Sequence, residues 1–235
     1  MRHGPLVFLG LFLAMAISWA GLVLYPQMQI GNQPVAVLDD STGQAYPIPR
    51  PGLAREGLDV YRANGCVYCH SQQVRYQGFG ADFERGWGKR WSVDRDYLYD
   101  SPVMLGEMRI GPDLANIGVR RGNDTNQVNL TWHLLHLYNP RINSPGSMMP
   151  AYPYLFAKRK VGDVPSPNAL KLTGEFAPEN GYEIVPRQEA LALVNYLFSL
   201  QSETPLFESS LPPSPKPKTP RGAAAGGAST NSPAK

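Results

Sequence analysis

Two cysteines and a histidine, Cys66, Cys69 and His70, form the spacing C-x-x-C-H. This spacing is typical of the attachment site for a covalently bound c-type haem. Each thiol can form a thioether to a vinyl group of the same porphyrin, and the following histidine lies where its imidazole can bind the iron. The chain has only two cysteines, so no second pair competes. We predict that Cys66 and Cys69 attach one haem and that His70 is an axial ligand.

Two other kinds of site use paired cysteines. A redox-active C-x-x-C usually lies between a strand and a helix, and no strand is expected before Cys66. A zinc site needs two more ligands at suitable spacing, and none follows the cysteines at that spacing. Both alternatives are weaker than haem attachment.

A haem that transfers electrons binds a second axial ligand, and methionine is the usual partner of histidine in c-type cytochromes. Met149 is the predicted ligand, because it lies in a Pro/Gly/Ser-rich loop and Pro150 restricts its backbone. The other possibilities are Met148 and, for a bis-histidine haem, His133 or His136. Met104 and Met108 are expected to pack against the porphyrin edge.

Other residues are predicted to support the haem. The Pro112 carbonyl, in Gly111-Pro112-Asp113-Leu114, could accept a hydrogen bond from the Nδ1–H of His70 and so orient the ring. A guanidinium binds a carboxylate in a fork geometry. The arginines considered as partners of the haem propionates are Arg75, Arg109 and Arg141.

An uncharged segment from Pro5 to Tyr25 precedes this chemistry. About 20 apolar residues suffice for a helix to cross a bilayer, so residues 5–25 are predicted to be a transmembrane anchor. Arg2 and His3 precede it, which by the positive-inside rule places residues 1–4 in the cytoplasm and the rest outside. A cleaved signal peptide ending near Ala20 is the rival interpretation; either one exports the haem motif.

The remaining chain divides by composition. Residues 26–51 are rich in Pro, Gly, Asn and Gln and are predicted to be an extended linker. Residues 52–201 form the predicted haem domain, and residues 202–235 are a Pro/Ala/Gly/Ser-rich tail predicted to be disordered. The net charge of +3, with no basic stripe, argues against nucleic acid as a partner.

Three helices are expected in the domain. One spans residues 52–65 and leads into the haem motif, and a short one spans Leu130–Tyr138. The third spans residues 186–201, where apolar residues follow helical spacing; Ala190, Leu193, Val194, Leu197 and Leu200 form this face. The first and last helices are predicted to pack together, with Gly57 or Ala54 allowing close approach to Tyr196 or Leu197. No alternating strand is recognised. The predicted fold class is all-α: a cytochrome c-like domain on one N-terminal transmembrane helix.

Several ordered segments together resemble a known family, the membrane-anchored mono-haem subunit II of cbb3-type cytochrome c oxidases. The matching segments are Gly65 to Gln72, Val74-Arg75, Glu84-Arg85, Ser92-Val93, Tyr99 to Pro102, Arg109 to Leu114, Gly118, Trp132-His133, His136 to Arg141 and Ser147 to Pro153. The resemblance covers the chain from about residue 52 to 155. It departs from the family pattern at Val74-Arg75-Tyr76 and in the Trp-rich segment 85–95.

The resemblance implies that His70 and Met149 ligate a single covalent haem c. It implies a non-catalytic electron relay in an oxidase complex of the bacterial inner membrane, with the haem domain on the periplasmic face. The partners would be the large haem-copper catalytic subunit, whose haem b receives the electrons, and a di-haem cytochrome c subunit or soluble cytochrome c as donor. It also implies a calcium ion at the subunit interface, near Glu107.

Two other functions fit the same architecture. The cytochrome c subunit of nitric oxide reductase is also a mono-haem domain on one anchor. A free-standing anchored electron carrier would need no permanent partner. The ordered set of segments favours the oxidase subunit over both.

Overall fold

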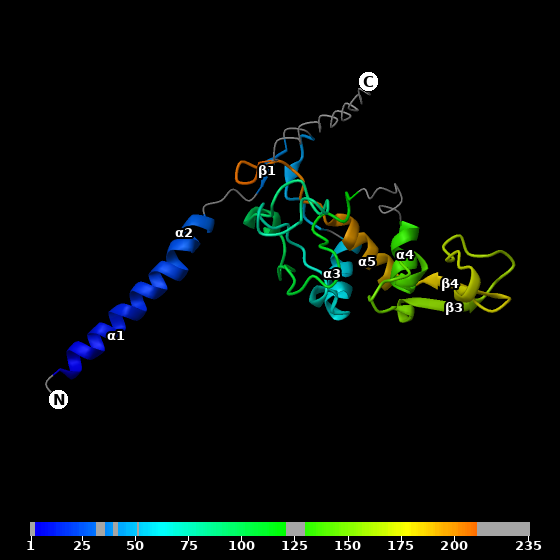
Figure 1. Cartoon of the computed structure of the whole chain (residues 1–235), viewed down its shortest axis with the longest axis horizontal. Helices are drawn as coiled ribbons and strands as arrows, with labels where there is room; N and C mark the ends of the chain where they lie inside the picture. The colour runs from blue at the N-terminus through cyan, green and yellow to red at the C-terminus, as the bar shows by residue number, and fades with distance from the viewer. Residues whose placement is uncertain (1–2, 32–35, 40–41, 51, 121–129, 211–235) are drawn as a thin grey trace, which may run out of the picture.

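The computed structural model describes residues 3–31, 36–39, 42–50, 52–120 and 130–210. It begins with a long apolar helix made of α1 (Gly4–Trp19), one π-helical turn (Ala20–Leu24) and α2 (Tyr25–Gly31). This helix extends away from the rest of the chain (Figure 1), and α1 has no buried residue. The helix formed by residues 4–29 is long and apolar enough to cross a membrane. A signal sequence has the same properties, so retention of the anchor and its orientation stay predictions.

A small antiparallel hairpin follows the long helix. Strand β1 (Val37–Leu38) pairs with β2 (Ala45–Tyr46), and Tyr46 is buried. The Tyr46 hydroxyl donates a hydrogen bond to Asp96 at 2.6 Å, and Arg50 forms an ion pair with Asp100. Part of the predicted linker is therefore folded against the domain, because Tyr46 supplies apolar surface that composition alone did not reveal.

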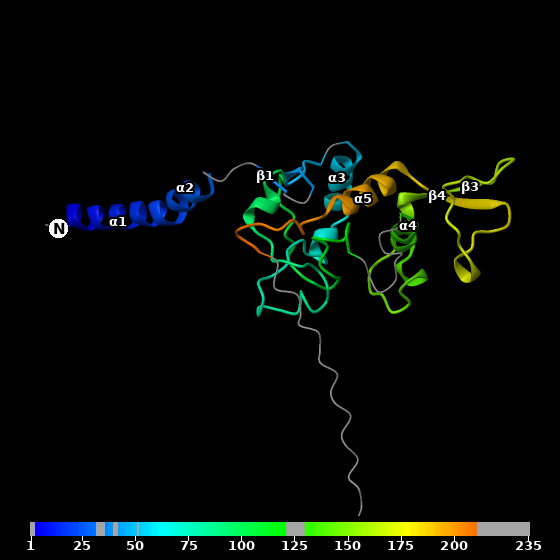
Figure 2. The same cartoon turned by 90° about the horizontal axis from the view of Figure 1, so that it is seen from above.

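Helices α3 (Leu53–Ala63) and α5 (Gln188–Ser199) cross and form the centre of the core. They lie side by side in both views (Figures 1 and 2). A Cβ atom on Gly57 would lie 2.0 Å from the Ala192 carbonyl oxygen and 2.7 Å from the Tyr196 Cβ. The rings of Tyr61 and Tyr196 are in tilted contact, with centroids 5.3 Å apart. The predicted packing of Gly57 against Tyr196 is confirmed.

The predicted apolar face of the last helix is also confirmed. Its members are buried, with exposed fractions of 0–8%: Ala190, Leu193, Val194, Leu197 and Leu200. Helix α4 (Leu130–Tyr138) has the predicted bounds and packs on α5. Short 3₁₀ turns occupy Cys66–Tyr68, Asp94–Tyr97, Pro140–Ile142, Pro153–Leu155 and Gly174–Phe176.

The fold is not purely α-helical, and that part of the prediction is wrong. Strand β3 (Phe156–Lys160) pairs antiparallel with β4 (Tyr182–Pro186), at the end of the globular part far from β1 (Figure 2). Along β3 only Phe156 is buried, and the three residues from Lys158 are exposed. Because one end of the strand carries the buried side chain, the sequence shows no alternation of period two.

Residues 202–210 differ from the predicted tail. They run back beside β1, drawn in orange in Figure 1, and Ser202, Leu206 and Ser209 are buried. Arg90, whose side chain is fully buried, donates from Nε to the Thr204 carbonyl at 2.6 Å. The remainder of the predicted tail, residues 211–235, lies outside the described residues.

Candidate functional site

The C-x-x-C-H residues lie on a tight turn directly after α3. Gly65 has φ +67°, a left-handed conformation that glycine adopts without strain and that ends the helix. The 3₁₀ turn Cys66–Tyr68 follows, and the His70 amide donates to the Cys66 carbonyl at 3.0 Å. One turn of backbone therefore presents both thiols and the imidazole together.

The environment of the cysteines differs from that of a redox-active pair. Cys66 is buried and Cys69 is half-buried, and they do not form a disulfide with each other. Burial raises the pKa of the Cys66 thiol to about 11, whereas reactive C-x-x-C thiolates have lowered pKa values. The turn follows a helix rather than a strand. No cluster of three or more His, Cys, Asp or Glu side chains suited to a metal ion occurs in the described ranges. Nothing here favours the redox or zinc alternative.

A large cavity opens in front of this turn. Its volume is about 880 Å³, at the upper end of the range for small-molecule and cofactor sites. The wall combines both cysteines and His70 with segments far apart in the sequence: Glu84 to Trp87, Ile110 to Pro112, Ile117, Arg120, Trp132, His136, Ser144, Gly146 to Pro150 and Tyr152. The cavity is thus large enough for a porphyrin and contains the residues that would attach one.

His70 is held by the loop that contains Pro112. Its Nδ1 lies 2.8 Å from the Pro112 carbonyl oxygen, so Nδ1 is the protonated nitrogen and Nε2 is left with a lone pair. Burial lowers the pKa of His70, while the hydrogen bond to Pro112 opposes this. A Cβ on Gly111 would lie 2.2 Å from the His70 Cε1, so only glycine lets the loop approach the ring. The arrangement is that of a metal-binding histidine with its supporting acceptor.

Asp113 fixes this loop to the haem motif. Its carboxylate is fully buried and accepts hydrogen bonds from the Ser71 hydroxyl at 2.6 Å, the Gln73 amide at 2.7 Å and the Ala115 amide at 2.9 Å. These bonds join the strand-like segment after His70 to the loop that carries Pro112. The position of the histidine ring is therefore determined by two segments about 40 residues apart in the chain.

The candidate methionine ligands differ in whether they line the cavity and in how exposed they are. Met149 lines the cavity and is partly buried against the core, whereas Met148 also borders the cavity but is 79% exposed. Met104 is buried in the core, Met108 is exposed, and neither lines the cavity. The expected packing of these two against the porphyrin edge has no support from their positions.

Only one of the two candidate histidines borders the cavity. His133 is buried in the core, with its ring edge-to-face on Phe198. His136 lines the cavity and stacks on Trp132, with ring centroids 4.7 Å apart. Its Nδ1 lies 2.8 Å from the Asn143 Oδ1, and the Asn143 amide donates to the Trp132 carbonyl at 3.1 Å. Because Oδ1 is an acceptor, the proton of His136 is on Nδ1.

The arginines predicted to bind propionates lie elsewhere. Arg75 and Arg109 both form ion pairs with Asp82, at 2.7 Å each, and neither lines the cavity. Arg141 is exposed and does not line it either. The arginines in the wall are Arg85 and Arg120, which the sequence offers no reason to prefer over other arginines, because only the fold brings them to the haem motif.

Glu107 is exposed on the loop before Gly111. The described residues contain no cluster of three or more acidic, histidine or cysteine side chains suited to a metal ion. The calcium site near Glu107 stays a prediction.

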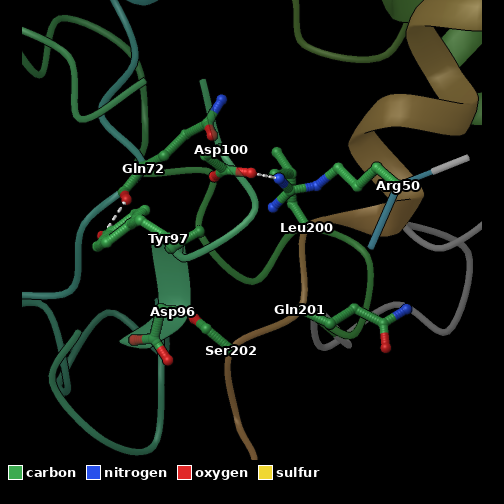
Figure 3. Close-up of a pocket in the computed structure, with 9 residues that line it drawn as sticks. Arg50, Gln72, Asp96, Tyr97, Asp100, Leu200, Gln201 and Ser202 are labelled. Atoms are coloured by element: carbon green, nitrogen blue, oxygen red, sulfur yellow. Dashed lines mark hydrogen bonds and ion pairs between the residues drawn. The ribbon is translucent and has the colours of Figure 1, made fainter. Parts of the chain in front are cut away.

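A second, much smaller cavity is lined by Arg50, Gln72, Asp100 and their neighbours (Figure 3). Its volume is about 20 Å³, room for about one water molecule. Arg50 reaches from the folded part of the linker to Asp100, and the Tyr97 hydroxyl donates to the Gln72 carbonyl at 2.7 Å. This cavity is too small for a cofactor and belongs to the packing of the domain.

Comparison with protein families gives one match. Residues 3–169, more than half of the chain, match the model of the family described as "Cytochrome C oxidase, mono-heme subunit/FixO". No curated protein matches the chain. The matched range contains the apolar helix, the cysteine turn and every residue that lines the large cavity.

Proposed function

The chain belongs to the FixO family of mono-haem cytochrome c oxidase subunits, and we propose that it relays electrons through a covalent haem c to the haem b of the catalytic subunit. As a family member it is a mono-haem cytochrome c subunit of a cbb3-type oxidase. The observation that carries the proposed relay is the hydrogen bond between His70 Nδ1 and the Pro112 carbonyl, in a cavity also bordered by Cys66, Cys69 and Met149.

The residues present fit a haem. Cys66 and Cys69 would hold it covalently, and His70 would bind the iron through Nε2, the nitrogen that the bond to Pro112 leaves free. Met149 would be the second axial ligand, because it is the less exposed of the two methionines in the wall. When bound, the haem supplies one-electron chemistry, with a potential set by ligation and burial.

The protein's own residues then have three tasks. His70 is kept in one tautomer by Pro112, which prevents proton exchange at Nε2. Asp113 anchors the loop of Pro112, so that the ligand keeps one geometry during reduction and oxidation. The buried core includes Cys66 and Ile117, which also line the cavity and give that part of its wall an apolar surface. In this proposal the apolar helix anchors the chain in the cytoplasmic membrane, and the haem domain lies on the outer face. The electrons come from a di-haem cytochrome c subunit or a soluble cytochrome c.

The test is purification of the complex from native membranes in mild detergent, through a tag on this chain. The expected result is haem-specific staining of this chain on a denaturing gel, together with a large multi-span subunit that carries haem b. The preparation should reduce oxygen with a reduced cytochrome c as donor. A matched preparation in which Cys66 and Cys69 are both alanine should lose the haem stain from this chain.

Three outcomes would contradict the proposal. Absence of covalent haem on this chain would rule out the relay. Nitric oxide turnover without oxygen turnover would point to a reductase subunit. A haem-bearing chain that purified alone in gentle detergents would be a free-standing carrier.

A further inference from the structure

Among the described residues, some arginines form ion pairs with carboxylates and others do not. Arg75 and Arg109 share the buried carboxylate of Asp82. Arg85 and Arg120 line the cavity, and within the described part of the chain neither forms an ion pair with a carboxylate. Among the residues that the structure describes, the wall therefore contains two cations without an ion-paired carboxylate, in a cavity that the proposed function assigns to a porphyrin with two propionates.

The two cations differ in their exposure. Arg85 is exposed, and its guanidinium lies 4.8 Å from the centre of the Trp87 ring, where water can solvate it. Arg120 is largely buried: its Nη2 donates to the Asp113 carbonyl at 2.5 Å, and its Nε has no hydrogen-bond partner among the described residues. Burial lowers the pKa of Arg120, partly offset by the charges of Asp113 and Glu203. A buried cation without a paired anion is costly.

We propose that Arg120 binds a haem propionate and that this charge pair raises the midpoint potential of the haem. The inference depends on the proposed function, since it requires a haem in this cavity. The bond to Asp113 uses one N–H of the guanidinium, and the others remain for a carboxylate, which arginine binds in a fork geometry. Asp113 thus holds both Arg120 and, through the Pro112 loop, the histidine.

The direction of the effect follows from where the charge lies. Arg120 and His70 line the same cavity, so the guanidinium lies near the iron that His70 would bind. A positive charge near the iron favours Fe(II) over Fe(III), because reduction lowers the charge at the metal. Removing Arg120 also leaves a propionate carboxylate without its counter-ion. Both consequences lower the potential.

The charge pair also determines how the potential responds to pH. With Arg120 present the propionate stays ionised through neutral pH, and the potential is insensitive to it. Without Arg120 the desolvated carboxylate has a raised pKa, and the potential falls as the pH rises through that value. Among the described residues, the titratable and charged groups that face Arg120 or share the cavity are His70, Glu84, Arg85, Asp113, His136, Tyr152 and Glu203, besides the cysteines that would attach the haem.

The experiment is redox titration of the haem c in the purified complex between pH 5 and 9. Three variants are compared with wild type: Arg120→Met, Arg120→Lys and, as a matched control on an exposed arginine, Arg141→Met. We expect Arg120→Met to lower the midpoint potential and to make it pH-dependent. Arg120→Lys keeps the charge and should restore most of the potential, and Arg141→Met should behave as wild type.

The readouts separate this inference from the proposed function. Loss of covalent haem from wild type would defeat both, whereas haem-loaded Arg120→Met with wild-type potential and pH response would overturn only the role of Arg120. A potential lowered equally in the Lys and Met variants, or lowered in Arg141→Met instead, would also overturn it. If Arg120→Met fails to fold, Arg120→Gln also removes the positive charge but keeps a polar side chain. Its midpoint potential and pH response are then judged by the same criteria.

Discussion

At the scale of single residues, the haem motif is built from contacts that tolerate little change. Gly65 ends α3 in the left-handed conformation, and Gly111 lets a loop approach the His70 ring. His70 is held in one tautomer by the Pro112 carbonyl. The cysteines and His70 were recognisable in the sequence from their residue types and their spacing, because haem attachment requires a fixed local pattern.

The assignment of Met149 as axial ligand is tested by Met149→Leu. The covalent haem should remain, because the cysteines are untouched, while the thioether ligand is lost. We expect the methionine–iron charge-transfer band to disappear and the midpoint potential to fall. The measurement is an absorption spectrum and a redox titration of the purified complex.

Met148→Leu is the control, and it should leave both signals unchanged, since this side chain is 79% exposed. If the band survived in Met149→Leu and vanished in Met148→Leu, the two assignments would be exchanged. If wild type itself showed no such band, His136, the histidine in the cavity wall, would be the next ligand to test.

Gly111→Ala tests the support of the proximal histidine. The new methyl group would lie 2.2 Å from the His70 Cε1, so the loop or the ring has to move. We expect the free energy of unfolding to fall by about 1–3 kcal/mol, as for other overpacked sites, and a smaller fraction of the chain to carry haem. Thermal unfolding and the ratio of haem absorbance to protein measure the two effects.

The matched control is Gly162→Ala, where an added Cβ would have one neighbour within 4 Å among the described residues, the Val164 carbonyl oxygen at 4.0 Å. This variant should unfold and load haem as wild type does. Equal behaviour of the two alanine variants would show that the Gly111 contact does not constrain the histidine.

At the scale of elements, the α3–α5 crossing and a buried ion-pair cluster hold the haem motif in place. Gly57 allows the crossing, and the pattern of apolar residues in α5 predicted it. No pattern in the sequence predicted the ion-pair cluster around Asp82. Arg75 and Arg109 are 34 residues apart in the chain, and only the folded loops bring both to one carboxylate.

The Asp82 cluster gives the domain an acid-dependent stability. Burial acts to raise the pKa of Asp82, but hydrogen bonds from Arg75 and Arg109 outweigh it and lower the pKa to about 2. A lowered pKa in the folded state stabilises the protein above the ordinary aspartate pKa of about 4. That contribution is lost as the pH falls toward 2.

Asp82→Asn should therefore lower the free energy of unfolding by about 3 kcal/mol at pH 7, because it leaves two arginines without their carboxylate. The difference from wild type should stay constant above pH 5 and shrink between pH 4 and pH 2. Denaturant unfolding at several pH values measures it. Asp163→Asn, on an exposed loop, is the control, and a difference independent of pH down to 2 would refute the linkage.

At the scale of the whole molecule, residues 202–210 close the domain against the folded part of the linker. Glu203 pairs with Lys89 at 2.5 Å, Glu208 pairs with Arg95, and the buried Ser209 hydroxyl donates to the Trp91 carbonyl at 2.7 Å. The family match ends at residue 169, yet α5 and this segment lie beyond it and complete the core. The domain thus depends on chain outside the matched range.

Truncation tests this dependence. A chain ending at Gln201 should lose about 3 kcal/mol or more of unfolding free energy, because buried Arg90 and Arg95 lose partners in residues 204 and 208. A chain ending at Ser210 keeps those partners and should unfold as the full chain does. Thermal unfolding of the two truncated proteins decides; equal melting temperatures would show that the segment contributes nothing.

The sequence alone determined those features that depend on local pattern. The haem motif has a fixed spacing, the apolar helix has a length set by the bilayer, and α3, α4 and α5 follow helical periodicity or composition over one continuous segment. Gly57 was recognisable because helices that cross closely need a small residue. The family followed from ordered motifs, and the comparison with family models agrees.

Only the tertiary structure decided which charged residues meet the cavity and which strands pair. Arg75, Arg109 and Arg141 were reasonable by residue type, but a guanidinium binds whichever anion the fold brings to it, and for two of them that anion is Asp82. Arg120 borders the cavity because Asp113 and the haem motif converge there. Strands β3 and β4, and residues 202–210, owe their structure to partners distant in the chain, whose contacts leave no periodic signal in the sequence.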